Sequence, residues 1–323
     1  MKILVTGGAG YIGSHTVKEL LRNGFETVVF DNFSSGRREF AAAGEVIAAD
    51  LMDLEAIKSA FRPGDIGAVL HFASLIQVGE SYLDPRKYYG HNLTTTMNLL
   101  EAMLEAGTRT IVFSSSAAVY GEPREIPIPE SHPMNPINPY GQTKFFIEKI
   151  LQDYDRAYGL KFISLRYFNA AGADPDGRLG EIHDPESHLI PNIMLSLLGR
   201  KRAFEVFGTD FPTPDGTAIR DYVHVSDLAS AHVLALRRLL SCGESGFFNL
   251  GSGTGFSVLD VMRKIEETTG RKIPAVMHPR RRGDVPILLA SKEKAEQELG
   301  WKRLYSSLES IVETAWKWHS RRP

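Results

Sequence analysis

The sequence predicts an α/β fold: a Rossmann-type, doubly wound parallel sheet followed by a smaller C-terminal α/β domain. Apolar runs rich in Val, Ile and Leu alternate with helical segments in the first half, which is typical of a parallel sheet covered on both faces. Gly7, Gly10 and Gly13 follow the first apolar run and open a helix. After Phe168 the composition shifts to Gly, Asp and Pro, so we divide the chain into domains 1–168 and 169–323. The segment near 226–250 is a candidate to return to the first domain.

Each element of the first half is bounded by residues that end it. Helices are expected to stop before Gly24 and Gly107, and the β-branched run after Gly24 ends at Asp31. A Pro-rich loop, 122–139, precedes the last helix. The expected strands are Lys2–Thr6, Thr27–Phe30, Val46–Ala48, Ala68–Phe72, Thr110–Ser114 and Lys161–Arg166, and the expected helices are Tyr11–Asn23, Tyr88–Glu105 and Tyr140–Tyr158.

The second half opens with a long ordered loop or domain connection, Asn169–Ser187, and then mixes short strands with helices. The expected strands are Phe204–Phe207, Tyr222–Val225, Phe247–Leu250 and Ala275–His278, and the expected helices lie near Ser226–Leu240, Ser257–Thr269, Ser291–Leu299 and Ser307–His319. This pattern suits a smaller α/β domain that binds a substrate.

The bulk composition excludes several classes of partner. A formal net charge of −2 gives no reason to expect nucleic acid or an anionic membrane as a partner. No window approaches the eighteen or so consecutive apolar residues of a membrane span. Cys242 is the single cysteine, so no intrachain disulfide is possible. Because the chain enters a strand and the glycine loop at once, we expect no cleaved signal peptide and a cytoplasmic protein.

The glycine loop indicates a dinucleotide site. Glycines permit a tight turn and close approach of the backbone, and the following helix presents its N-terminus to a pyrophosphate. Asp31 lies eighteen residues past Gly13, where a carboxylate binds the ribose hydroxyls and repels a 2′-phosphate. NAD is therefore favoured over NADP, although Arg37 and Arg38 are a mild counter-signal. Asp50 either holds the adenine edge or is an ordinary solvated or helix-capping Asp.

Three side chains form a candidate catalytic set. Tyr140 and Lys144 are four residues apart and share one helix face. A neighbouring cation favours the phenolate, and an oxidised nicotinamide adds positive charge; lowering a phenol pKa by roughly three units takes about 4 kcal/mol. Ser116 is the last of three serines, Ser114-Ser115-Ser116, at the end of a predicted strand. In open parallel sheets, ligands bind at this carboxyl edge. This set predicts hydride chemistry beside a nicotinamide.

The chain resembles the extended short-chain dehydrogenase/reductase superfamily and, within it, the UDP-glucose 4-epimerase family. The resemblance runs through most of the chain in the family's order. The matching segments are Val5–Gly13, His71–Ala73, Val78–Ser81, Phe113–Ala117, Val119–Gly121, Pro139–Lys144, Arg166–Asn169, Asp215–Thr217, Arg220–Val225 and Arg281–Asp284.

The resemblance implies that UDP-glucose and UDP-galactose are interconverted. Tyr140 would take the proton of the sugar 4-hydroxyl, Lys144 would bind the nicotinamide ribose, and Ser116 would hydrogen-bond the same sugar oxygen. C4 would be oxidised to a 4-keto sugar, which would rotate and be reduced from its other face by the bound NAD. No metal is implied. A homodimer is implied, through a four-helix bundle of helices like 88–105 and 140–158.

The resemblance also implies the binding residues. The cofactor set is Gly7, Gly10, Tyr11, Ile12, Gly13, Asp31, Asn32, Asp50, Leu51, Phe72, Ala73, Asn92, Lys144 and Phe168. The substrate set is Ser116, Tyr140, Asn169, His188, Leu189, Phe207, Arg220, Arg281, Asp284 and Leu288. Arg suits a diphosphate because its donors form a fork that binds two oxygens at once.

Departures from the family pattern leave alternatives open. His188 stands where some members have Asn, Ile76 where some have Lys, and Leu288 where the sugar pocket is gated. Another UDP-sugar, N-acetylglucosamine or glucuronate, is an alternative substrate. A nucleotide-sugar dehydratase is disfavoured because Ala117 and Ala118, not acids, follow Ser116. A non-enzymatic NAD sensor is disfavoured because the Tyr/Lys pair is present.

Overall fold

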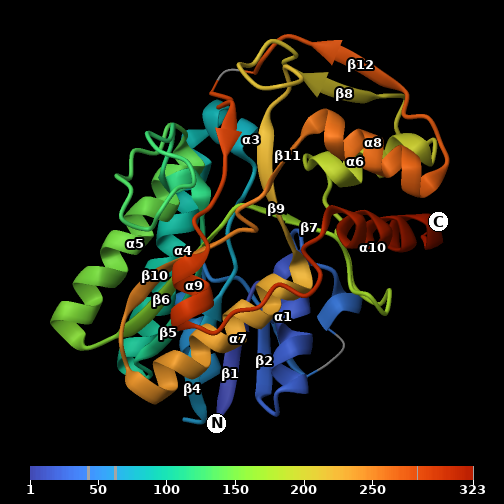
Figure 1. Ribbon diagram of the computed structural model, residues 1–323. Coiled ribbons are helices and arrows are strands. Elements are labelled where there is room, and N and C mark those ends of the chain that lie inside the picture. Colours follow the sequence, from blue (N-terminus) through green and yellow to red (C-terminus); the bar gives the residue numbers. More distant parts are fainter. Residues whose placement is uncertain (42–43, 62–63, 282, 323) are drawn as a thin grey trace.

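The computed structural model of the protein describes residues 1–41, 44–61, 64–281 and 283–322. A seven-stranded parallel sheet forms its base, in the order β10-β6-β5-β4-β1-β2-β3 (Figure 1). The strands are β1 (Lys2–Thr6), β2 (Glu26–Asp31), β3 (Glu45–Ala48), β4 (Ile66–His71), β5 (Thr110–Ser116), β6 (Lys161–Tyr167) and β10 (Gly246–Leu250). The predicted α/β class and the doubly wound sheet are confirmed.

Helices cover both faces of this sheet because successive strand residues point to opposite sides. On one face, Ile3 and Val5 pack in a core with α1 (Tyr11–Arg22) and α7 (Val225–Cys242). On the other, Leu4 packs with α2 (Leu54–Phe61), α4 (Pro85–Glu105) and α5 (Pro139–Tyr158). The short α3 (Val78–Leu83) contacts both α4 and α5.

The remaining elements form a smaller region above the carboxyl ends of these strands (Figure 1). A mixed sheet joins β7 (Asn169–Ala171), β9 (Ile219–His224), β11 (Gly255–Ser257) and β13 (Ile287–Leu288), and β8 (Phe204–Phe207) pairs with β12 (Ala275–His278). A third core packs α6 (Leu189–Leu197), α8 (Val258–Thr269) and α10 (Leu308–Arg321) together. The helix α9 (Glu293–Glu298) belongs instead with the first region, where it lies against β10.

The chain crosses between the two regions more than once. From β9 it enters α7, which packs on α1, and then β10, which pairs with β6 at the sheet edge. The division at residue 168 remains a prediction, and the structure adds that 225–250 belong spatially to the first region.

Several short elements were not predicted. The sequence analysis named no helix at α2, α3 or α6 and no strand at β7, β11 or β13. Each is at most nine residues long, and strands of two or three residues carry no measurable period. Among the described residues, no helix is both long and apolar enough to cross a membrane.

Candidate active site

The glycine loop between β1 and α1 is closely packed. A Cβ at Gly13 would lie 2.2 Å from the carbonyl oxygen of Gly7, and one at Gly7 would lie 2.6 Å from the Ala73 nitrogen. Gly7 also has a φ of +70°, which L side chains rarely adopt. Gly10 provides no side-chain cap for α1, which begins at Tyr11. The first amides of α1 therefore form a bare cradle of the kind that binds a pyrophosphate.

Asp31 at the end of β2 is tied to this loop. Its two carboxylate oxygens accept hydrogen bonds from the backbone nitrogens of Ala9, at 2.9 Å, and Phe33, at 2.8 Å. Burial raises the pKa of Asp31, against these hydrogen bonds. A carboxylate has about four acceptor positions, so two remain for the ribose hydroxyls expected there. Asn32 donates to Asp50 at 2.8 Å, which links the ends of two neighbouring strands.

The other predicted cofactor residues surround the same edge of the sheet. The backbone nitrogens of Phe72 and Ala73 donate to Thr6, and the Phe72 ring lies 4.6 Å from the His232 ring. Asn92 on α4 donates to Thr143 of α5 at 3.1 Å. The remaining members are Tyr11, whose hydroxyl donates to Gly172; Ile12, on the α1 core face; Leu51, buried after β3; and Phe168, just past β6.

Tyr140 and Lys144 lie on the first two turns of α5, and residues with a preference for helix N-termini precede them. Asn138 caps the helix by accepting from the Gly141 nitrogen at 2.7 Å, and Pro139 occupies its first turn. Both functional side chains are buried. The Lys144 ammonium donates to the Ser114 carbonyl at 2.9 Å and lies 5.8 Å from the centre of the Tyr140 ring.

Burial controls the titration of this pair. It raises the pKa of Tyr140 to about 12, against a hydrogen-bonding effect of Ser116. Burial also lowers the pKa of Lys144 to about 7, against the charge of Glu148. Lys144 is not among the groups that shift the Tyr140 pKa here, because its ammonium donates to the Ser114 carbonyl, so the expectation that Lys144 lowers this pKa stays a prediction. Positive charge in the cofactor site is the remaining source of such a shift.

The three serines that end β5 have different partners. Ser114 hydrogen-bonds the Tyr167 hydroxyl, and Ser115 donates to Glu148 at 2.7 Å. The Ser116 hydroxyl accepts from the Ala118 nitrogen at 3.2 Å and also influences Tyr140. Ser116 is therefore the serine that the structure brings to the Tyr140 side of the strand end, as the sequence analysis selected.

The sequence analysis missed a buried ion pair behind the catalytic set. Arg166 of β6 donates to Oε1 of Glu148 at 3.0 Å and to Oε2 at 2.7 Å, and it also donates to the Tyr120 hydroxyl. Glu148 lies one helical turn beyond Lys144, so the 140-144-148 spacing was an available signal. Asp221 was likewise assigned no role, although it accepts from the Ser252, Gly253 and Ala290 nitrogens.

Several of the predicted substrate residues lie around β9 and the segment that ends in β13. Arg220 and Leu288 are register partners, and the charges of Arg281 and Asp284 both act on Arg220. Arg281 donates to Asp284 at 3.1 Å and lies over the Phe207 ring at 4.9 Å. Burial lowers the pKa of Arg220. Arg282 of the same motif lies outside the described residues.

Asn169, Leu288 and His188 each have specific neighbours. Asn169 donates to the Asp221 carbonyl at 3.2 Å. Leu288 packs beside Tyr120 and Ile128, in the small cluster that Phe168 also joins. His188 hydrogen-bonds Glu181 and precedes Leu189, the first residue of α6. Its imidazole is thus engaged by a carboxylate, which the sequence analysis did not expect.

Known proteins match this chain in sequence over most or all of its length. Residues 3–251 match the NAD dependent epimerase/dehydratase family. A UDP-glucose 4-epimerase of Halalkalibacterium halodurans is 51% identical over 323 residues, 100% of this chain and 97% of that protein.

Solved structures of UDP-glucose 4-epimerases have the same fold as this chain. The UDP-glucose 4-epimerase of Brucella ovis in complex with NAD has a TM-score of 0.95 and 47% identity, over 98% of this chain and 97% of that one. The UDP-glucose 4-epimerase of Bifidobacterium longum in complex with NAD⁺ and UDP also has a TM-score of 0.95, with 38% identity over 100% and 99%.

Proposed function

The chain belongs to the NAD dependent epimerase/dehydratase family, and on that premise we propose that it interconverts UDP-glucose and UDP-galactose by inverting C4 of the hexose. One observation carries the proposal: Tyr140, Lys144 and Ser116 stand together at the carboxyl edge of the sheet in a chain that matches UDP-glucose 4-epimerases over its full length. The protein is an isomerase.

NAD fits the nucleotide site. The crowded glycines leave no room for a side chain above the α1 amides, and Asp31 has acceptor positions to spare. When bound, NAD supplies the oxidant for C4 and the reductant that restores it. Lys144 would hold the nicotinamide ribose, and Asp31 would hold the adenosine ribose. A 2′-phosphate would meet the Asp31 carboxylate, so NAD is favoured over NADP.

Tyr140 is the base for the sugar 4-hydroxyl in this proposal. Its burial excludes water from the phenol, and the Ser116 hydroxyl is placed to share the same substrate oxygen. Since the protein alone leaves the Tyr140 pKa at about 12, efficient proton removal depends on positive charge brought into the site with the cofactor. Proton transfer by Tyr140 would thus depend on binding of the cofactor.

Arg220, Arg281 and Asn169 would bind the UDP part of the substrate. The Arg220 and Arg281 guanidinium groups repel each other, and Asp284 supplies only one negative charge beside them, so a diphosphate would complete their neutralisation. Leu288 lies close by, opposite Arg220 in the strand register, and would border the sugar. A 4-epimerase of UDP-N-acetylglucosamine is the second candidate, because Leu288 lacks a ring that would close the pocket.

We also propose a homodimer. Tyr89, Leu93 and Met97 follow one another at four-residue spacing on α4, and Phe146 and Ile150 do so on the adjacent α5. Met97 is 39% exposed and Phe146 is 40% exposed, which is high for large apolar side chains on packed helices. Two copies of this face would form a four-helix bundle.

The test is an assay on purified protein with no added cofactor. UDP-galactose should be converted to UDP-glucose, and denaturation should release NAD at close to one molecule per chain. A panel with the N-acetyl forms and UDP-glucuronate then ranks the sugars. Conversion of another UDP-sugar with none of UDP-galactose would replace the proposed substrate. Release of NADP in preference to NAD would contradict the role of Asp31.

A further inference from the structure

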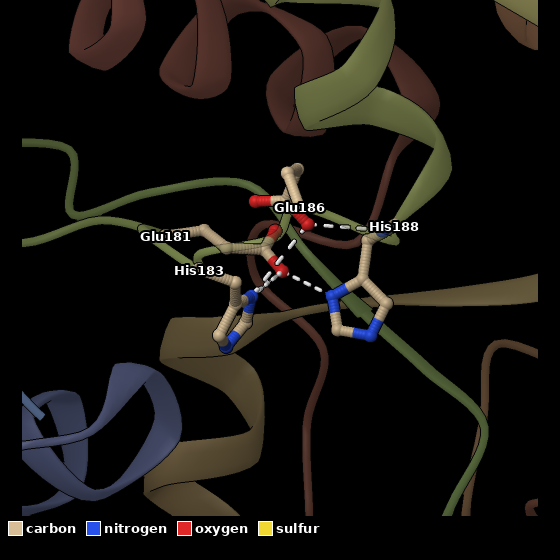
Figure 2. A group of neighbouring side chains, drawn as sticks. All are labelled: Glu181, His183, Glu186 and His188. Carbon is tan, nitrogen blue, oxygen red and sulfur yellow. Dashed lines mark hydrogen bonds and ion pairs between the residues drawn. The ribbon is translucent and has the colours of Figure 1, made fainter. Parts of the chain in front are cut away.

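Four side chains of the segment between β7 and α6 converge on one point (Figure 2). They are Glu181, His183, Glu186 and His188, and one nitrogen or oxygen of each lies within 4.8 Å of the others. We propose that these residues form a binding site for one divalent transition-metal ion of the zinc class. The sequence analysis expected no metal and gave His188 a substrate-binding role instead; none of the four residues belongs to the Tyr140, Lys144 and Ser116 set.

The spacing between the facing atoms suits such an ion. Bonds of 2.0–2.2 Å to nitrogen and oxygen place tetrahedral ligand atoms about 3.3 Å apart. The His183 Nδ1 lies 3.2 Å from Glu181 Oε1 and 3.6 Å from Glu186 Oε1. His188 Nδ1 and Glu181 are in closer contact than this spacing, so these two side chains would have to move apart when an ion binds. A pair at the 4.8 Å limit would have to close by more than 1 Å, and the half-exposed His188 side chain has space to make that movement.

One atom in the cluster is buried and makes no hydrogen bond. The His183 Nδ1 is shielded from solvent, and although it is within ion-pair distance of two carboxylates, its geometry satisfies no hydrogen bond. Buried polar atoms are normally satisfied. A metal ion between Nδ1 and the two carboxylates would use this nitrogen lone pair.

The surroundings hold the ligands in place. Glu186 accepts from the backbone nitrogens of Ser187 and His188, both at 2.9 Å, which fixes its carboxylate. The Tyr11 ring packs edge-on against His183 with ring centres 6.4 Å apart. The side chains of Glu181 and Glu186 are only 3% and 4% exposed. Oriented ligands on a constrained backbone raise metal affinity.

The charge balance favours a cation. The carboxylates of Glu181 and Glu186 are both shielded from solvent and face the centre of the cluster, which lowers the cost of placing positive charge there. Imidazole nitrogen suits zinc, nickel, copper and iron, whereas magnesium and calcium prefer oxygen alone. With two nitrogens and two oxygens, the set points to the first group of metals.

Binding would pin the connecting segment to the nucleotide region. The cluster contacts Tyr11, which begins α1 directly after the glycine loop, while His188 leads into α6. An ion at this point would therefore resist separation of the two regions, so it should stabilise the folded chain.

The test uses full-length protein without a polyhistidine tag. After incubation with ZnCl2 and removal of free metal, elemental analysis should find about one zinc per chain. The double variant E181Q/H183Q should bind zinc at least about tenfold more weakly. The matched control is Glu205→Gln, which breaks an exposed His–Glu contact of 3.4 Å with His278 and should keep the zinc.

A second measurement covers the possibility that the variant misfolds. Zinc at a hundredfold excess over its dissociation constant should raise the wild-type Tm by roughly 5 °C, and Co²⁺ should give the visible absorption of a low-coordinate nitrogen and oxygen site. Zinc content equal in the wild type and a correctly folded E181Q/H183Q would overturn the proposal. So would a wild type that retains no zinc and shows no shift in Tm, which would leave the cluster as histidine–glutamate ion pairs.

Discussion

At the residue scale, the proposed catalytic pair shows how strongly burial shifts the protonation of a side chain. Tyr140 and Lys144 are both removed from water, and burial favours the neutral form of each. The phenol pKa therefore rises to about 12 while the ammonium pKa falls to about 7. The two pKa values thus shift in opposite directions, and both shifts favour the neutral side chain. Charge supplied by the cofactor and the substrate would then decide which group ionises.

Tyr140→Phe should lower the epimerisation rate at least about a hundredfold, the low end for losing a general base. The change removes one hydroxyl and keeps the ring that fills the start of α5. The control is Tyr158→Phe on the same helix, whose side chain is 54% exposed and outside the site. Native turnover by Tyr140→Phe would refute the assignment, whatever the control shows.

Lys144→Met should change how stability depends on pH. The Lys144 pKa is about 7 in the folded chain, against an ordinary value of 10.5 once the side chain is exposed to water, so the unfolded chain binds more protons between these values. Stability contributed by this residue therefore rises as pH increases from 7 to about 10. Over that pH range, the free energy of unfolding measured in urea should rise more for the wild type than for Lys144→Met. Lys149→Met, at an exposed lysine of α5, is the control, and parallel pH curves for wild type and Lys144→Met would contradict the expectation.

Leu288→Tyr should narrow the substrate range. Interiors are close-packed, so a Leu in place of a ring leaves room for a 2-acetamido group. We expect the wild type to prefer UDP-glucose and UDP-galactose and to show measurable turnover of UDP-N-acetylglucosamine. The variant should lose the N-acetyl activity by roughly 10–200-fold and keep the other. Equal N-acetyl turnover in both proteins would make Leu288 a packing residue only.

At the element scale, β5, β6 and α5 are joined by one buried polar network. Glu148 of α5 accepts from Ser115 of β5 and from Ser164 and Arg166 of β6. Burial acts to lower the pKa of Arg166, but the hydrogen bonds and charge of Glu148 more than offset it, so the pKa is raised. This network fixes the helix that carries Tyr140 against the strand that carries Ser116.

Glu148→Gln should destabilise the protein by about 3–5 kcal/mol, because it leaves the Arg166 guanidinium buried without its counter-charge. The side chains of this pair are 2% and 1% exposed. Asp153→Asn breaks an ion pair with Arg156 on the same helix, where both side chains are 72% exposed, and should cost less than about 0.5 kcal/mol. Denaturant unfolding measures both; similar costs for the two variants would show that burial does not govern this pair.

At the scale of the whole molecule, the two regions are interleaved through α7 and β10. A fragment ending at residue 168 would lack α7 and leave the α1 core residues Val17 and Leu20 uncovered. Lys18 of α1 also contacts Asp174 beyond that boundary, at 2.6 Å. The region that would bind the sugar therefore packs directly against the region that would bind the cofactor.

The proposed dimer gives a prediction at the same scale. Met97→Glu with Phe146→Glu should produce a monomer, because four buried charges in a symmetric bundle would have no partners. Light scattering after size exclusion measures the mass. Leu304→Glu changes a side chain that is 76% exposed elsewhere and should leave the mass at that of a dimer. A monomeric wild type at micromolar concentration, or a dimeric double variant, would refute the proposed interface.

Local chemistry in the sequence determined much of this protein. Apolar runs predicted the parallel strands, the glycine spacing predicted the crowded β1–α1 turn, and the four-residue spacing placed Tyr140 and Lys144 on one face of α5. The helical period and the contact between Gly7 and Gly13 act between residues that are close in the chain, whereas the approach of Ala73 to Gly7 comes from the pairing of β1 with β4.

Tertiary structure alone decided the rest. The pairing of Glu148 with Arg166 and the direction of the Tyr140 pKa depend on which segments lie above each side chain. The approach of Arg281, Asp284 and Leu288 to Arg220 depends in the same way on strand pairing across distant parts of the chain. Desolvation and cross-chain contacts are set by packing, and packing is fixed only when the whole chain has folded.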